Sequence, residues 1–317
     1  MTRRILLSAL LACALASPAH AYFERTDAGA RILALGPSGM ASVSDVSAYH
    51  WNPAALVSVD RHEVLLDYSK PFGVPDLNEN TIVVGGRYTC VGYAVAWHHV
   101  GVSNVYGEDQ FCVSGAKVMS IGPIGTFDAG ATFKFGRASF QPYTVEGEGR
   151  YDWGAVSRGS LDFGGRWRTP WSMDVSYVLR DALQPRYEFV YGSGGYHVLA
   201  RSEVAAALRW NRESTISVGW AQQPGGGSQL SAGLEIVFFN VFALRSGLRD
   251  IGKIYAAQQS PNYNIYSETP PRGFSFTGGI GVFHKGYFVD AAAETNHDLG
   301  ATYRASLRVP FGPGGKR

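Results

Sequence analysis

The sequence predicts an all-β protein, a closed antiparallel transmembrane β-barrel of about 14 strands with a short N-terminal plug segment. Three observations lead to this fold class. The 317-residue chain begins with an export signal, and it is rich in glycine and aromatic residues but only 17% charged. Segments of about ten residues alternate apolar and polar side chains along most of its length. The connections between these segments alternate in length, which is typical of outer-membrane barrels.

Residues 1–21 have the pattern of a cleavable signal peptide. Arg3 and Arg4 form a basic start, the apolar stretch 5–16 is too short to span a bilayer, and Ala19-His20-Ala21 is a cleavage site. An uncleaved anchor helix is the alternative, but no stop-transfer stretch follows. A lipoprotein at Cys13 is disfavoured because Leu11 and Ala12 fit a lipobox poorly. We expect cleavage after Ala21, export, and a final location in the outer membrane of a Gram-negative type cell.

Charge and cysteine content exclude several classes of protein. Removing residues 1–21 takes away two arginines and no acidic residue, so the mature chain carries 26 basic and 26 acidic residues. A nucleic-acid partner would need a basic face, and none is expected here. Cys90 and Cys112 remain after cleavage. They can form one pair in an exported protein, but two cysteines do not make a disulfide scaffold.

The segment 22–57 differs from everything that follows it. Its stretch 29–56 lacks sustained alternation, is rich in Gly, Ala and Ser, and ends in Trp51-Asn52-Pro53-Ala54. Asn-Pro marks a turn, and Ser44-Asp45 can cap one or two helical turns that Pro53 ends. We expect a plug inside the barrel, anchored by Tyr49 and Trp51, with Asn52 satisfying backbone groups near the break at Pro53. The barrel then occupies 58–311 and a tail 312–317.

Alternation defines the strands. In 301–311, Tyr303, Ala305 and Leu307 share one face, whereas Thr302, Arg304, Ser306 and Arg308 share the other. Fourteen segments follow this pattern, an even number that suits a closed barrel. They are residues 60–70, 79–89, 91–102, 109–120, 124–139, 159–169, 171–183, 198–210, 213–223, 228–239, 241–252, 272–284, 286–296 and 300–311. A soluble β-sandwich or propeller would also alternate, so the strands alone do not decide the fold.

Loop length decides it in favour of the barrel. Every second connection is a short turn, and the longest connections, 140–158, 184–197 and 253–271, all fall at the opposite, outer end. A sandwich or propeller has no reason to sort its loops in this way. Aromatic side chains support the orientation, because such rings favour membrane interfaces. Beside the short turns lie Trp167, Trp171, Trp210, Phe239 and Tyr287, and near the outer ends lie Tyr68 and Trp220.

The polar faces of the strands predict a lumen with nearly balanced charge. Its candidate residues are Asp162, Arg166, Arg168, Asp174, Arg180, Glu203, Arg209, Glu235, Arg245, Arg249, Asp290, Glu294, Arg304 and Arg308. Opposite charges on neighbouring strands favour ion pairs that fill a narrow interior. An open water-filled pore would tolerate the same residues, although one sign of charge usually dominates its constriction. We favour the filled or plugged interior.

No pattern of residues indicates an enzyme, a cofactor or a metal. The chain lacks the G-x-S-x-G, H-E-x-x-H, Walker and C-x-x-C motifs. The glycine runs 192–195 and 225–227 fall in expected loops, where they do not favour a phosphate site. His98 and His99 are adjacent in an expected strand, so they should point to opposite faces and cannot share a metal ion.

The stretch 28–56, which ends in Tyr49-His50-Trp51-Asn52-Pro53-Ala54, resembles the N-terminal region of the PorV/PorQ group, itself related to FadL-type outer-membrane channels. Residues 160–181, 230–250 and 273–311 look like later hairpins of that family. The resemblance implies a 14-stranded barrel with an inward-folded N-terminal plug. It also implies two functions: a passive route for small hydrophobic molecules towards a sideways opening in the wall, or an accessory, docking or shuttle role in type IX-like protein secretion.

The chain departs from both patterns. It is short, its outer loops are modest, and Ala55 stands where the FadL-like pattern has Gly. Small loops argue against a large cargo-binding surface, so neither activity is carried over residue by residue. We expect the hydrophobic route first and the secretion role as the alternative, and a purely structural role stays open. The expected partners are outer-membrane lipid and either a hydrophobic small molecule or secretion proteins.

Overall fold

The computed structural model describes residues 27–145, 149–189, 195–211, 213–223, 227–251, 274–296 and 300–312. Structural statements below refer to these residues. The expected signal peptide 1–21, the outer connection 253–271, most of the glycine runs 192–195 and 225–227, and the tail after Gly312 lie outside them.

The N-terminal segment, residues 27–59, folds into four short helical pieces. They are α2 (Ala30–Leu35), the 3-10 helix η1 (Pro37–Ala41), α3 (Ala48–Trp51) and the 3-10 helix η2 (Pro53–Ser58). Asp45 precedes α3, and its Oδ1 accepts a hydrogen bond from the Ser47 amide at 3.0 Å. The expected helix before Pro53 is therefore confirmed as one turn. Pro53 also begins η2, because a proline lacks only an N–H that the first helical position does not need.

Fourteen antiparallel strands form one closed barrel, which confirms the predicted fold class. The barrel closes where the first strand pairs with the last, from His62 opposite Phe311 to Lys70 opposite Tyr303. Its strands are β1 (His62–Lys70), β2 (Leu77–Tyr88), β3 (Val91–Val102), β4 (Tyr106–Gly122), β5 (Gly125–Phe140), β8 (Ala155–Arg168), β9 (Met173–Arg180), β12 (Arg201–Arg209), β13 (Ser214–Gln223), β14 (Gly227–Phe238), β15 (Phe242–Ile251), β16 (Ser275–His284), β17 (Tyr287–Asn296) and β18 (Gly300–Phe311), and η3 (Pro71–Gly73) follows β1.

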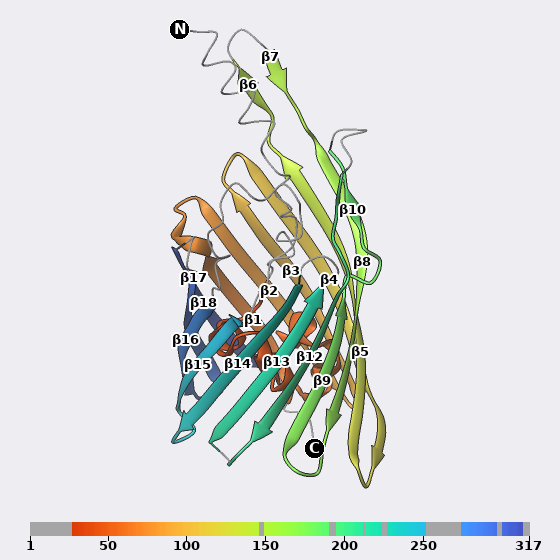
Figure 1. Cartoon of the computed structure of the whole chain (residues 1–317), viewed down its shortest axis with the longest axis vertical. Helices are drawn as coiled ribbons and strands as arrows, with labels where there is room; N and C mark the ends of the chain where they lie inside the picture. Colours follow the sequence, from red (N-terminus) through yellow and green to blue (C-terminus); the bar gives the residue numbers. More distant parts are fainter. Residues whose placement is uncertain are drawn as a thin grey trace, which may run out of the picture.

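The two ends of the barrel differ as loop parity predicts. Six connections at one end have at most four residues, whereas the long connections lie at the other end (Figure 1). Two of these long connections contain short strands that the sequence did not indicate. The first carries the ribbon β6 (Tyr143–Val145) and β7 (Gly149–Tyr151), and the second carries β10 (Arg186–Tyr187) and β11 (Tyr196–His197). The ladder of β5 with β8 also continues to Ala155, so β8 begins four residues earlier than expected.

Apolar side chains cover the outside of the barrel and charged ones face inward. On β18 the outward Tyr303 is 59% exposed, whereas the inward Arg304 is 4% exposed. A soluble protein has the opposite arrangement, so the closed barrel is built to span a bilayer. None of the helices in the described part of the chain is long and apolar enough to cross a membrane. Cys90 is exposed and Cys112 is buried, and the pairing that the sequence allowed does not occur.

Candidate functional site

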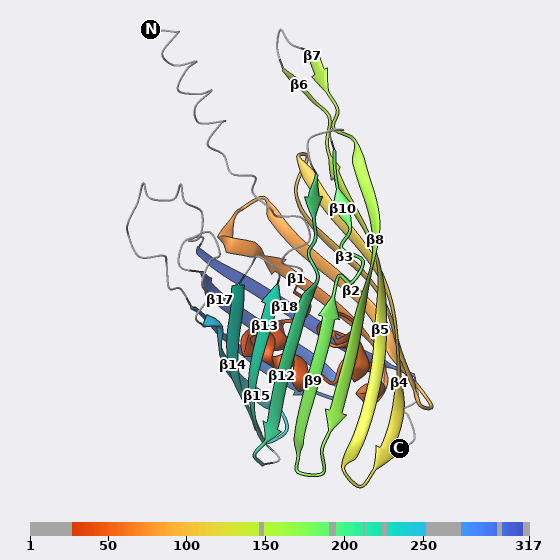
Figure 2. The same ribbon diagram turned by 45° about the vertical axis from the view of Figure 1, so that its right-hand side comes forward.

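The N-terminal segment lies inside the barrel and reaches the wall on several sides (Figures 1 and 2). The helix η2 packs against β3, β4, β5 and β8, η1 packs against β12, β13 and β14, and α2 packs against β15, β16 and β17. A segment held by strands all around the lumen occupies its cross-section. The candidate site is therefore the lumen at the level of this segment, together with the spaces between the segment and each end of the barrel.

An apolar core forms between the segment and the wall. Ile32, Leu35, Met40, Val46 and Leu56 are fully buried inside the barrel. They form one cluster with inward-facing wall residues. These wall residues are Leu65, Val83, Ala94, Ala96, Cys112, Ala116, Val178, Ala205 and Ala207. Charged and small side chains were expected in the lumen, and six of these nine wall residues are small, but the larger Leu65, Val83 and Val178 were missed. The sequence signal that could have revealed this part of the wall is the presence of apolar residues at inward-facing positions of the strands.

Wall glycines bring the segment close to the strands. A Cβ added at Gly130 would lie 2.6 Å from the Ala54 amide nitrogen, and one at Gly164 would lie 2.8 Å from Pro53 Cδ. On the opposite wall, a Cβ at Gly247 would lie 2.6 Å from the Leu35 carbonyl carbon. Real Cβ atoms do not approach other atoms so closely. These inward positions therefore need glycine because a backbone approaches them.

The predicted plug residues Tyr49, Trp51, Asn52 and Pro53 lie together where α3 and η2 pack against the wall. Tyr49 is buried, and its carbonyl oxygen accepts a hydrogen bond from Thr132 Oγ1 at 2.8 Å. Trp51 is buried and donates its indole N–H to the Ala28 carbonyl. Asn52 donates to Ser176 Oγ at 2.9 Å, and its Oδ1 accepts from the Ala54 amide at 3.1 Å. Asn52 thus links the wall to the first amide of η2 next to the buried Pro53.

Arginines of the wall bind backbone carbonyl oxygens of the segment. Arg180 donates to the His50 and Trp51 carbonyls at the end of α3. Arg304 donates to the Asp27 carbonyl at 2.6 Å, and Arg87 donates to the Val57 carbonyl at 3.0 Å. The carbonyls of His50, Trp51 and Val57 lie in the last turns of α3 and η2, where they have no partner within the helix and a nearby cation is favourable. These bonds hold both ends of the segment to the barrel.

On the outer side of the segment, the inward charges form paired clusters. Arg249 lies 2.7 Å from Asp27 and 3.5 Å from Glu294. Arg180 lies 3.0 Å from Glu203. Two further groups join Lys134 to Asp162 and Asp181, and Arg304 to Asp67 and Glu79. Most of these groups are buried, so pairing offsets the cost of removing their charges from water.

The short-turn side has a second set of ion pairs. Arg245 lies 2.7 Å from Glu235 and 2.6 Å from Asp290, and Arg31 of the segment lies 2.8 Å from Glu235. Arg166 and Arg168 share Asp128, and Arg209 pairs with Asp174 at 3.1 Å. Arg308 lies farther from its partners, 3.5 Å from Asp45 and 3.7 Å from Glu63.

All fourteen candidate lumen residues thus face inward and have a partner of opposite charge. Several of those partners were missed from the sequence. Asp67, Glu79, Asp128 and Lys134 lie at inward-phase positions of expected strands, so alternation could have found them. Asp27, Arg31 and Asp45 belong to the segment, where no strand phase exists to place a side chain.

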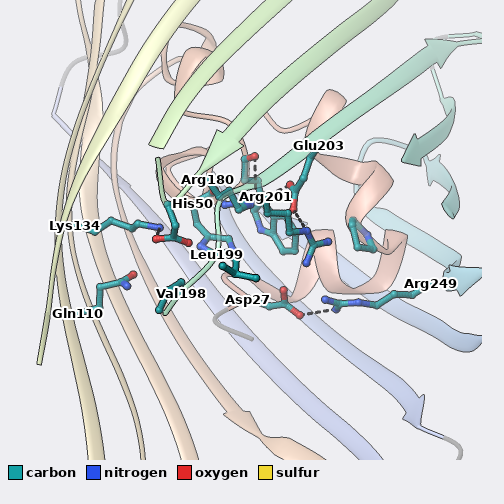
Figure 3. A pocket seen from close by; sticks show the side chains of 13 residues that line it. Asp27, His50, Gln110, Lys134, Arg180, Val198, Leu199, Arg201, Glu203 and Arg249 are labelled. Atoms are coloured by element: carbon teal, nitrogen blue, oxygen red, sulfur yellow. Dashed lines mark hydrogen bonds and ion pairs between the residues drawn. The ribbon is translucent and has the colours of Figure 1, made fainter. Parts of the chain in front are cut away.

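Polar side chains line the small space just outside the segment. This cavity of about 70 Å³ lies among Trp51, His50, Lys134, Arg180 and Glu203 (Figure 3). Burial lowers the pKa of the His50 imidazole well below its ordinary value, and the positive charge of Arg180 acts in the same direction. The volume of the cavity is about half that of an engineered apolar cavity of about 150 Å³ that binds benzene, so a small aromatic molecule does not fit here without movement of its walls.

The outer mouth carries an aromatic cluster that the sequence did not indicate. Ala138, Tyr187 and Val198 are buried together, with Tyr106, Val156, Phe189 and Tyr196 packed against them. Phe140 joins this aromatic cluster through contacts of its ring with those of Tyr106 and Phe189. The rings of Tyr106 and Phe140 lie 4.7 Å apart, and those of Phe140 and Phe189 lie 4.9 Å apart. The ribbon β10–β11 and the wall strands bring these residues together. Only tertiary contacts reveal this apolar patch, because its members are far apart in sequence.

Histidines and acidic groups do not converge on a metal site. No group of three or more potential ligands is found in the described ranges. His98 faces inward, and its Nδ1 lies 2.7 Å from Thr81 Oγ1. His99 faces outward, and its Nδ1 lies 2.9 Å from Asp109 Oδ1. The expectation that the two rings point to opposite faces is therefore confirmed.

Comparison with solved structures places the fold among FadL-type channels. A FadL homologue from Pseudomonas aeruginosa matches over 92% of this chain and 100% of its own, with a TM-score of 0.59 and 11% identity. The Pseudomonas putida toluene transporter TodX matches over 90% of this chain and 97% of its own, with a TM-score of 0.57 and 9% identity. The CymD monoaromatic hydrocarbon channel matches over 89% and 99%, with a TM-score of 0.56 and 9% identity.

These matches show a shared fold, because identities near 10% carry no more than that. No protein-family model and no curated protein matches the chain. The FadL-like part of the resemblance is confirmed at the level of the fold, and the PorV/PorQ part stays a prediction. Two of the matched proteins are named as a toluene transporter and a monoaromatic hydrocarbon channel.

Proposed function

We propose that the chain is an outer-membrane barrel that gives small hydrophobic molecules a passive route across the membrane, and that it reaches the membrane through the cleavable signal 1–21. The observation that carries the proposal is the aromatic cluster at the outer mouth, on a fold shared with a toluene transporter and a monoaromatic hydrocarbon channel. Rings such as those of Phe140 and Phe189 offer apolar surface to a molecule that water excludes.

The N-terminal segment acts as the plug in this proposal. Its apolar core and its ion pairs to the wall oppose the flow of water and ions through the lumen. Since the space beside Trp51 is too small for an aromatic ring, passage requires movement of the segment or of the β10–β11 ribbon. The barrier to ions and the route for apolar molecules are then separate properties. The secretion alternative rests on the sequence resemblance alone.

Uptake of 1-N-phenylnaphthylamine tests the proposal. The dye becomes fluorescent in membranes, and an intact outer membrane slows its uptake. Cells that express the chain should take it up faster than cells with an empty vector. Phe140→Asp should remove the gain, because it places a charge in the aromatic cluster. Trp153→Asp is the matched control, because Trp153 is exposed and lies outside that cluster. Equal uptake with and without the assembled chain would reject the function.

A further inference from the structure

A second, larger cavity opens at the short-turn end of the barrel. It has a volume of about 590 Å³ and lies between the segment and strands β14, β16, β17 and β18. Arg31 and Ser44 of the segment form its roof. Cavities that hold small molecules typically measure about 300–1,000 Å³. This one is therefore large enough for a ligand in the conformation seen here, unlike the space beside Trp51.

One wall of the cavity is apolar. Val237, Phe283, Phe288 and Pro310 line it. Phe283 and Phe288 point inward, since their neighbours Val282 and Val289 are 44% and 52% exposed on the outer face. The two rings lie 5.0 Å apart at an angle of 57°. Inward positions further along β17 are Asp290, Ala292 and Glu294, so the aromatic pair is confined to the mouth.

Four cations, Arg31, Arg61, Lys285 and Arg308, also line the cavity. The guanidinium of Arg308 lies 3.8 Å over the Phe288 ring, and its carboxylate partners lie 3.5 Å and 3.7 Å away. These distances exceed the 2.6 Å and 2.7 Å of the Arg245 pairs, so Arg308 retains capacity for another acceptor. Arg61 and Lys285 are exposed at the rim, near Asp60. Glu63 and Glu235 also line the cavity, but both already face arginines: Glu63 faces Arg308, and Glu235 pairs with Arg31 and Arg245.

We propose that this cavity binds a small aromatic molecule that carries one carboxylate. The ring contacts Phe283 and Val237, and the carboxylate accepts hydrogen bonds from Arg308 and attraction from Arg61 and Lys285. The inference rests on the proposed function and deepens it, because it names the class of molecule held at the inner mouth. Binding of this kind needs both halves of the cavity, and a neutral hydrocarbon or an aromatic amine satisfies only one.

Ligand-observed fluorine NMR tests the proposal on the full chain in lipid nanodiscs. The probe is 4-fluorobenzoate, whose charge keeps it out of the bilayer, and 4-fluorobenzylamine is its cationic counterpart. The benzoate signal should broaden with the protein and not with empty nanodiscs, and the amine signal should stay sharp. Phe283→Ser should weaken benzoate binding about tenfold through lost apolar contact. Arg61→Gln with Lys285→Gln should weaken it about fivefold, and less at high salt.

Two matched variants control for indirect effects. Tyr143→Ser and Arg150→Gln change an aromatic ring and a cation on the exposed β6–β7 ribbon at the other end, and both should bind benzoate normally. Equal broadening by amine and benzoate, or by wild type and Phe283→Ser, would overturn the proposal. So would an absence of benzoate binding while expressing cells still take up phenylnaphthylamine, and that result would leave the proposed function intact. Benzoate binding without uptake would reject the function alone.

Discussion

Adjacent glycines on β8 allow a sharp test of how the N-terminal segment is held. Gly164 faces inward, and a Cβ there would lie 2.8 Å from Pro53 Cδ and closer still to Asn52 Oδ1. Gly165 faces outward, and a Cβ there would meet nothing within 4 Å. Gly164→Ala and Gly165→Ala therefore make the same chemical change one residue apart on one strand. We expect only the first to loosen the segment.

The size of the effect follows from the contacts at Asn52. Overpacking of a well-packed site costs about 1–3 kcal/mol. Displacing Asn52 also weakens its bonds to Ser176 Oγ at 2.9 Å and to the Gly165 carbonyl at 3.3 Å, each worth about 0.5–1.5 kcal/mol. The packing of the segment against β8 should thus lose roughly 2–6 kcal/mol. At tenfold per 1.4 kcal/mol, the displaced state should become about 30 to 20,000 times more populated.

Planar-bilayer recording measures this change as the frequency of open events. The heat-dependent shift of folded barrels on gels should first show that both variants assemble. Gly164→Ala should then open far more often than wild type, and Gly165→Ala should match wild type. If both variants behave alike, the close approach of Asn52 and Pro53 to β8 does not hold the segment. If the intact protein already conducts steadily, the segment does not close the lumen.

Four further outcomes are expected. N-terminal sequencing of membrane-extracted protein should begin at Tyr22, and a start at Met1 or Cys13 would contradict cleavage after Ala21. In a background without Cys90 and Cys112, Trp153→Cys should react with an impermeant reagent on intact cells and Lys285→Cys should not; the reverse pattern would invert the topology. Leu307→Arg should impair membrane assembly by about 2–4 kcal/mol because it places a cation in lipid, whereas Arg308→Leu should still assemble. Equal effects of the two variants on the folded band in gels would exclude a bilayer around β18. Deletion of residues 29–56 should leave a conducting barrel in planar bilayers, with Trp51→Ala between it and the closed wild type, and no added conductance would rule out a plug.

The barrel could be predicted from the sequence because the patterns that define it, side-chain alternation and turn length, depend on neighbouring residues. A strand in a bilayer must alternate between lipid and lumen, so Tyr303, Arg304 and Ala305 reveal their facing from order alone. The lengths of the connections likewise distinguish the two ends of the barrel from the order of residues alone. Pro53 and Asn52 likewise acted through their nearest neighbours, which is why the one-turn helix before them was predicted.

Only the tertiary structure decided which residues of the segment and of the wall meet in the lumen. The segment has no strand phase, so nothing in the order of its residues indicates that Arg31 reaches Glu235, 204 positions away. Gly164 resembles any other strand glycine until Pro53 is seen packed against it. The aromatic cluster at the outer mouth and the Phe283–Phe288 pair at the inner one also depend on which strands the closed barrel brings together. Alternation predicts a direction for each side chain, whereas contacts across a lumen depend on the register and curvature of the whole barrel.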